Sequence, residues 1–334
     1  MTESTEESAA IPDVPLSDDL PPVQPPSAGF IVQLFIFPAL IVMGVVAIWW
    51  MFGLIAVGEQ DWRKLLQELQ SQNLHIRNRA MFGLAQVLEQ DSRRADQGHQ
   101  LRSNREIAQG LADQLVIELR KNSSSKEGVA IQEYLTRAMG MLDSLEVTAP
   151  ALHLAMEPQR DIDIRKSAIV SLSFIAGRAL ERSEPLDSKE SVEALIQATS
   201  DPLPVIRHSA AYALGLFRSP EATHQLEVLL GNSEQMTQMN AAIGLARQGS
   251  TVGFDVIRDS LSGKSRSGQT PEDEFLVTKN ALKVVSELAT KLDDKQREEI
   301  APLLDRLSSS HSEIRIRIDA ADAVNHLKAA RTSP

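Results

Sequence analysis

The side chains that most often do chemistry in proteins are scattered along this chain without the spacing that a catalytic or metal site requires. The seven histidines are His75, His99, His153, His208, His224, His311 and His326. None begins a His-Glu-x-x-His motif, which places two imidazoles on one helix face around zinc, and none is followed by Glu. The chain has no Cys, which excludes a thiolate nucleophile and a Cys-based zinc site. We therefore expect no metal centre.

Motifs for cofactors and activated nucleophiles are also missing from the sequence. It contains no Walker loop, no Gly-x-Gly-x-x-Gly and no Gly-x-Ser-x-Gly. The 45 acidic residues are spread over amphipathic segments, which indicates solvated helix faces rather than a paired general acid and base. The expectation is a protein that is not an enzyme and binds no cofactor.

The elements that would have to position any site follow a repeated helical pattern. The submotif Ile-Arg-x-x-Ala occurs four times, and its arginines are Arg77, Arg165, Arg207 and Arg317. Each of the first three copies continues with apolar or small residues at offsets 4, 7, 8 and 11 from the Ile, which places them on one helix face. Small residues at offsets 4 and 7 would let a neighbouring helix approach closely.

A shorter amphipathic segment and a polar turn precede each copy, as in 192–198 followed by 200–202. Looser copies of the submotif lie at 131–142, 237–245 and 277–282. The unit is therefore a helix, a tight turn and a second helix, repeated about seven times over residues 59–330. One such pair cannot bury its apolar face alone, so stacked pairs must share a core. The predicted fold class is an all-α solenoid, followed by a short tail at 331–334.

The copy at 206–215 reads IRHSAAYALG. It resembles HEAT repeats, particularly the short type of phycobilisome-lyase-like proteins, and the resemblance covers 59–330. This resemblance implies a right-handed α-solenoid that acts as a binding scaffold. In such families an acidic residue of the turn often pairs with the motif Arg of the same or the next repeat, and the candidates here are Asp161, Asp201 and Glu313. The resemblance thus implies a structural ladder rather than a ligand role for the motif arginines.

The second helix of a HEAT-like unit usually lines the concave surface of the solenoid. At offsets 2 and 6 of this helix, beside the main stripe, stand Lys166, His208, Phe82 and Tyr212. Aromatic side chains often anchor protein interfaces, so these residues are candidates for partner contacts. Packing against the next helix is the alternative, and the sequence leaves both open.

Composition narrows the class of partner. The net charge is −11; residues 1–28 carry six acidic and no basic residues, which leaves 34 basic against 39 acidic residues, or −5, in the rest. A duplex DNA binder usually has a clearly basic balance, so we expect no nucleic-acid partner. The low aromatic content of 4% favours helices packed through Leu and small residues over a β-sandwich. The expected partner is a protein of unknown identity.

Residues 30–57 form an uncharged apolar stretch ahead of the repeats. As a helix this stretch would span roughly 42 Å, more than the hydrocarbon core of a bilayer at about 30 Å. We expect one transmembrane helix from Phe30 to Val57, bent where Pro38 removes a backbone hydrogen bond, with Trp49 and Trp50 at the interface. A cleaved signal peptide is disfavoured, because the preceding segment is acidic and the apolar run is too long.

The flanks of this stretch predict its orientation. Residues 1–29 are rich in Pro, Ser and acidic residues, so we expect disorder there. They carry no Lys or Arg, whereas Arg63 and Lys64 follow the stretch. The positive-inside rule therefore favours an outer N-terminus and cytoplasmic repeats. Three loops interrupt the repeats at 91–105, 121–128 and 260–274; the first carries four arginines that either contact anionic lipid or, more simply, are solvated.

Together these features predict a single-pass membrane protein whose repeats hold a protein partner at the membrane surface. One alternative is an accessory or regulatory subunit of a membrane complex such as a transporter, in which the anchor itself makes specific contacts. A minor alternative, drawn from the resemblance, is a lyase-like HEAT enzyme, which a tetrapyrrole spectrum would reveal. The sequence does not predict an oligomeric state.

Overall fold

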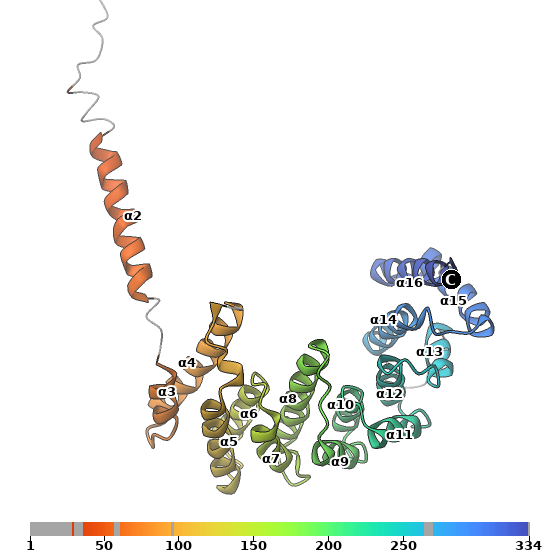
Figure 1. The fold of residues 1–334 in the computed structure, drawn as a ribbon, viewed down its shortest axis with the longest axis horizontal. Helices are drawn as coiled ribbons and strands as arrows, with labels where there is room; N and C mark the ends of the chain where they lie inside the picture. Colours follow the sequence, from red (N-terminus) through yellow and green to blue (C-terminus); the bar gives the residue numbers. More distant parts are fainter. Residues whose placement is uncertain (1–28, 30–35, 57–60, 95–96, 264–269, 333–334) are drawn as a thin grey trace, which may run out of the picture. The chain divides into compact units, whose positions relative to one another are not determined.

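The computed structural model describes residues 29, 36–56, 61–94, 97–263 and 270–332. Its contacts divide the chain into two units, Met1–Glu59 and Gln60–Pro334. The first unit holds helix α2 and the second holds helices α3 to α16 (Figure 1). The predicted tail lies outside the described residues apart from Gly29, and so do Phe30 and Val57.

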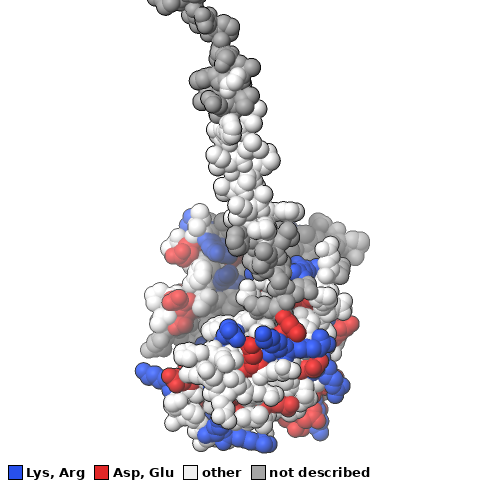
Figure 2. All heavy atoms as spheres, turned by 90° about the vertical axis from the view of Figure 1, so that its left-hand side faces the viewer, with Lys and Arg blue, Asp and Glu red and all other residues white. Residues whose placement is uncertain are grey.

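Helix α2 (Phe37–Ala56) has 20 residues and no charged side chain. Its described atoms are therefore white in Figure 2, where Lys and Arg are blue and Asp and Glu are red. Its described large apolar side chains, Trp49 and Trp50 among them, are exposed. Pro38 is the second residue of α2, and because residues 30–35 before it lie outside the described residues, the predicted bend stays a prediction. Within the described residues, no helix combines the length and the apolar character needed to cross a membrane. The span 30–57 stays a prediction.

The helices of the second unit alternate between two layers, which we call layer A and layer B. Layer A contains α3 (Trp62–Leu69), α5 (Arg105–Arg120), α7 (Leu145–Met156), α9 (Lys189–Ala198), α11 (Pro220–Leu229), α13 (Phe254–Leu261) and α15 (Asp294–Ser310). Layer B contains α4 (Leu74–Arg93), α6 (Lys126–Met139), α8 (Ile162–Glu181), α10 (Pro204–Leu214), α12 (Gln235–Arg247), α14 (Pro271–Leu288) and α16 (Ile314–Thr332).

Each layer-A helix packs on the layer-B helix that follows it, and successive layer-B helices pack side by side (Figure 1). The described part of the second unit thus holds seven helical pairs and no strand. This arrangement confirms the prediction of an all-helical repeat fold, because each pair shares its apolar face with its neighbours.

Nine of the described helices begin at a residue whose side chain caps their first backbone N–H groups. The Asn104 side chain accepts N–H bonds from Glu106 at 2.9 Å and Ile107 at 3.1 Å at the start of α5. Thr270 and Asp273 form a reciprocal capping box at α14. Side-chain caps also begin α3, α4, α6, α8, α9, α11 and α15. Each cap satisfies N–H groups that the helix leaves unpaired, which fixes the start of even the eight-residue helix α3.

The repeat frame inferred from the sequence coincides with the core. The alanines at offset 4 are all fully buried: Ala80, Ala168, Ala210, Ala241, Ala281 and Ala320. The loose copy at 131–142 corresponds to α6 and its following turn, and it buries Leu135, Met139 and Leu142 completely. This copy fills the long interval between the first two alanines.

Helices α10 and α12 come into backbone contact. A Cβ atom added to Gly215 would lie only 2.5 Å from the Cα atom of Gly244, so neither position has room for a side chain. Helix α12 also separates two hydrophobic clusters. Its Ala241 and Leu245 belong to the cluster that starts at α3, whereas Ala242 belongs to the cluster that continues to α16. Helix α12 therefore lies between the two hydrophobic clusters and contributes side chains to both.

The predicted loop at 91–105 is partly tied to the core. Asp91 lies inside α4, is buried, and accepts the backbone N–H of Leu101 at 2.7 Å. Residues 95–96 in this loop and 264–269 in the predicted loop at 260–274 lie outside the described residues. In the third loop, at 121–128, the Ser125 hydroxyl caps α6 by accepting the N–H of Gly128 at 3.1 Å.

Candidate functional site

The motif arginines of layer B connect successive repeats. Arg165 of α8 pairs with the carboxylate of Asp201, in the turn after α9, and the two side chains are only 5% and 6% exposed. Asp201 also accepts the backbone N–H of Leu203 at 2.9 Å, which fixes the turn before α10. In the first pair, Arg77 reaches forward to Glu118 of α5 at 3.2 Å. A layer-B arginine thus joins its own repeat to the next one.

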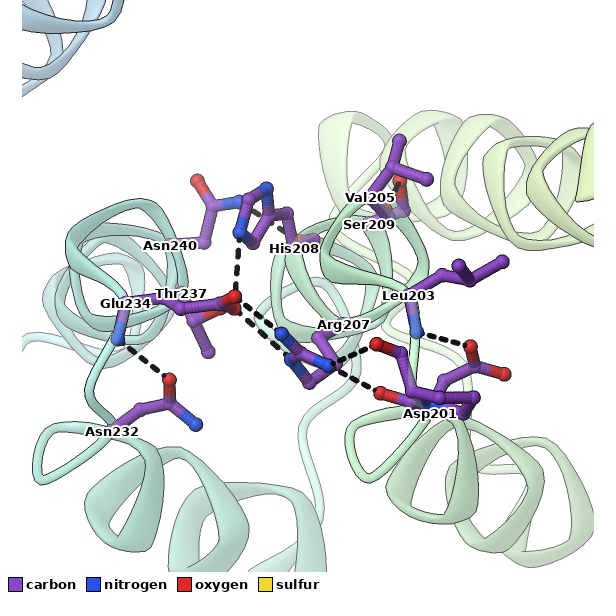
Figure 3. Close-up of polar contacts among 11 residues, drawn as sticks. Asp201, Leu203, Val205, Arg207, His208, Ser209, Asn232, Glu234, Thr237 and Asn240 are labelled. Carbon is purple, nitrogen blue, oxygen red and sulfur yellow. Dashed lines mark hydrogen bonds and ion pairs between the residues drawn. The ribbon is translucent and has the colours of Figure 1, made fainter. Parts of the chain in front are cut away.

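Arg207 forms the same kind of ion pair between repeats, one repeat later than Arg165 (Figure 3). Its guanidinium pairs with Glu234, the residue before α12, and Nε lies 3.0 Å from the carboxylate. It also donates to the backbone carbonyls of Asp201 and of Pro202, the latter at 2.9 Å. The carbonyl of Asp201 and its carboxylate therefore serve two different arginines.

In the last repeat, as for Arg207, the motif arginine donates to two backbone carbonyls of the turn that precedes its helix. Arg317 of α16 donates to the carbonyls of His311 at 2.6 Å and Ser312 at 3.3 Å, which stand six and five residues before it, as Asp201 and Pro202 stand before Arg207. Glu313, predicted as its partner, lies in the turn, where its backbone N–H donates to the His311 ring at 3.1 Å.

Two acidic positions have roles that the sequence did not reveal. Asp161 caps α8 by accepting the backbone N–H of Asp163 at 2.9 Å, although it stands four residues before Arg165. Glu234 was missed as the partner of Arg207, because it follows 27 residues later, in the turn of the next repeat. A spacing rule that searched the following turn would have found it.

His208 lies beside the ion pair of Arg207 and Glu234, and its ring is half-buried (Figure 3). Its Nε2 atom is 3.3 Å from the Glu234 carboxylate, and the Asn240 side chain donates to the His208 carbonyl at 2.8 Å. Burial lowers the pKa of His208 below its ordinary 6.5, although Glu234 acts in the opposite direction. The hydrogen bond from Arg207 lowers the pKa of Glu234. At neutral pH the imidazole is therefore uncharged beside a charged carboxylate.

A groove runs along layer B next to these joints. Section 1, of about 770 Å³, lies among α8, α10, α12 and α14. Section 2, of about 890 Å³, lies among α4, α6 and α8. Val170, Phe174 and Arg178 of α8 line both sections, so the two adjoin along that helix. We refer to both sections together as the layer-B groove.

The four residues predicted to contact a partner all lie on layer B. His208 and Tyr212 line section 1, and Lys166 lines section 2. Phe82 is 67% exposed on α4 and packs edge-on against Tyr134, with ring centroids 5.5 Å apart. Tyr134 itself lines section 2, and burial raises the pKa of its hydroxyl to about 12. The sequence left packing and partner contact open, and the exposure of Phe82 shows that packing leaves most of its ring uncovered.

The sequence missed two prominent side chains of the groove. Phe174 is 59% exposed and stands between the two sections. The Arg247 guanidinium lies over the Tyr212 ring, 4.7 Å from its centroid. Both residues stand at offset 10 of their repeat frames, as does Leu216, one helical turn beyond offset 6. Extending the offset-6 row by four residues would have found them.

Residues 192–267 match the family of HEAT repeats. Among solved structures, the archaeal HEAT-like repeats protein from Thermococcus onnurineus NA1 is similar, with 12% identity, a TM-score of 0.48 and coverage of 81% of this chain and 98% of that chain. The complex of CpcE and CpcF of phycocyanin lyase from Nostoc sp. PCC7120 has 17% identity, a TM-score of 0.43 and coverage of 80% and 95%. A designed armadillo repeat protein in complex with the peptide (KR)4 has 14% identity, a TM-score of 0.39 and coverage of 80% and 100%. A comparison with curated proteins finds no match.

Proposed function

We propose that this chain is a membrane-anchored scaffold that holds a protein partner in the layer-B groove. The observation that carries the proposal is that aromatic rings are exposed along the layer-B groove. Phe174 and Tyr212 are 59% and 39% exposed there, beside the polar side chains of Asn240 and Arg247. Aromatic anchors with a few polar groups are typical of surfaces that bind proteins.

The charged groups of the groove favour recognition over catalysis. Arg178, which lines both sections, is held by Asp143 at 2.7 Å, and beside the groove Glu234 is held by Arg207, so these groups stabilise contacts between helices. Within the described residues, no three His, Asp or Glu side chains come close enough to hold a metal ion. We therefore assign no reaction to this groove.

The membrane part of the proposal rests on the uncharged apolar stretch 30–57 of the sequence. As a continuous helix its 28 residues would extend roughly 42 Å, more than the hydrocarbon core of about 30 Å. The exposed rings of Trp49 and Trp50 near its C-terminal end suit the headgroup region. Arg63 and Lys64 follow, and the positive-inside rule then favours repeats on the cytoplasmic side.

The proposal is tested by placing a photoreactive amino acid at position 174 of the full chain in its native membranes. A matched control carries it at position 228, because Val228 is similarly exposed (56%) but lies on layer A. We expect one discrete protein adduct from position 174 that does not form from position 228. The same adducts from both positions, or none from position 174, would contradict the scaffold function.

A further inference from the structure

Section 1 of the groove has an uneven charge. Among the described residues that line it, Glu181 is the one acidic side chain, whereas Arg178, Arg247 and Lys283 are basic. Arg178 is already neutralised by Asp143 at 2.7 Å. Lys283 is 72% exposed and has Glu287 only at 3.8 Å on its own helix, a contact that stabilises little. Arg247 and Lys283 against Glu181 therefore leave the lining of section 1 with an excess of one positive charge.

Arg247 is poised for an anionic ligand. The Tyr212 ring supports its guanidinium at 4.7 Å and limits its freedom of movement. Its Nη1 atom has no hydrogen-bond partner within the described structure but is shielded from solvent, so a ligand would meet the part of the guanidinium that lines section 1. A carboxylate is the acceptor that best fits the planar fork of a guanidinium.

Aromatic surface adjoins these two cations. Phe174 of α8 and Tyr212 of α10 line the same section, and Gly177 of α8 has no heavy atom within 4 Å of the position of a Cβ atom. An apolar side chain of a ligand can therefore pack on the Phe174 ring while a neighbouring acidic side chain reaches Arg247. Both Phe174 and Arg178 also line section 2, which gives an extended segment a path along layer B.

We propose that section 1 binds an extended acidic segment of a protein partner, with one carboxylate on Arg247, a second near Lys283, and an apolar side chain on Phe174. This inference rests on the proposed scaffold function and names the chemistry of the partner. A basic segment is disfavoured there, because it would face two cations of the same sign. A small anion would leave the aromatic wall uncovered, which favours a peptide.

The test selects peptides from a displayed library of random dodecapeptides on the full chain in lipid nanodiscs. We expect selected peptides to combine Asp or Glu with an aromatic or aliphatic neighbour. Their affinity should fall about tenfold or more in R247Q, and in K283Q to a lesser degree, because a charge-assisted hydrogen bond or ion pair is lost. Lys189→Gln is the matched control: it removes one positive charge from an exposed layer-A position and should leave binding unchanged. E181Q should strengthen binding.

The outcomes separate this inference from the proposed function. Peptides whose binding needs Phe174, as judged by F174S, but that lack acidic residues would overturn the inference and leave the scaffold function standing. Acidic peptides that bind R247Q and K283Q as well as the natural protein would do the same. If no selected peptide depends on Phe174, both the inference and the groove as a binding surface are wrong.

Discussion

Arg165 of α8 and Asp201 of the following turn form a buried ion pair that joins two repeats. Removing one partner of such a pair leaves the other charge uncompensated in the interior, which costs about 3–5 kcal/mol. We expect Arg165→Met to lower the free energy of unfolding by this amount. Urea denaturation of the full chain in detergent micelles, followed by circular dichroism, measures it.

The double variant R165M/D201N is the control for this prediction. Asn keeps an acceptor for the Leu203 N–H, which Asp201 accepts at 2.9 Å, and it removes the orphaned charge. We therefore expect the double variant to recover most of the lost stability. A loss below about 1 kcal/mol in R165M itself would mean that the pair behaves as a surface ion pair.

The contact between α10 and α12 predicts opposite effects for two glycines of layer B. Gly215→Ala would place a Cβ atom 2.5 Å from the Gly244 Cα, so the helices must move apart, at a cost of about 1–3 kcal/mol. Gly177→Ala meets no atom within 4 Å inside a helix, so it should gain about 0.5–1 kcal/mol. Thermal unfolding of both variants checks this, and equal shifts in the two would refute the close approach.

Stability should fall as the pH falls below 6.5. Burial lowers the pKa of both His208 and His153 in the folded protein, although Glu234 and Glu190 oppose it. Near their ordinary pKa of 6.5 the unfolded chain therefore binds more protons than the folded one, and protonation favours unfolding. Glu234, whose pKa is lowered mainly by its bond to Arg207, adds a further loss below its ordinary pKa of 4.5.

The double variant H153Q/H208Q separates the histidines from the carboxylates. Without the two rings, the urea midpoint should change less between pH 7.5 and pH 5.5, while the loss at more acidic pH remains. An unchanged pH dependence in this variant would show that other groups control stability in that interval.

Several of these relationships follow from the sequence and others do not. The offset-4 alanines could be predicted as core, because helix periodicity fixes which face is buried. Arg165 with Asp201 could not be paired with the same certainty, because the turn of the next repeat comes close only after the pairs stack. Phe174 and Arg247 could be placed on the layer-B face, but their groove arises from the packing of four helices. The spacing of residues along the sequence does not identify the protein partner.

The proposed membrane anchor predicts retention of the chain in membranes. We expect the full chain to stay in the pellet after alkaline carbonate extraction, whereas a variant with Val42→Asp and Val46→Asp in α2 should be released. Charged residues in the middle of a membrane helix cost about 2.5–3.5 kcal/mol each. Replacing α2 with an unrelated transmembrane helix should restore retention and the adduct at position 174. Retention without the adduct would favour the alternative of a complex subunit with specific anchor contacts.

The central claim is that the layer-B groove holds a protein partner, and Gly177 offers the most direct test of it. No heavy atom lies within 4 Å of a Cβ position on Gly177, which lines section 1, so a Leu side chain there would project into the groove. The measurement is the affinity of the partner captured at position 174, once purified, for the full chain carrying G177L or G177A. We predict that G177L weakens binding about tenfold or more, while G177A binds as the natural protein does. Equal affinities for both variants would contradict the claim that the partner occupies this groove.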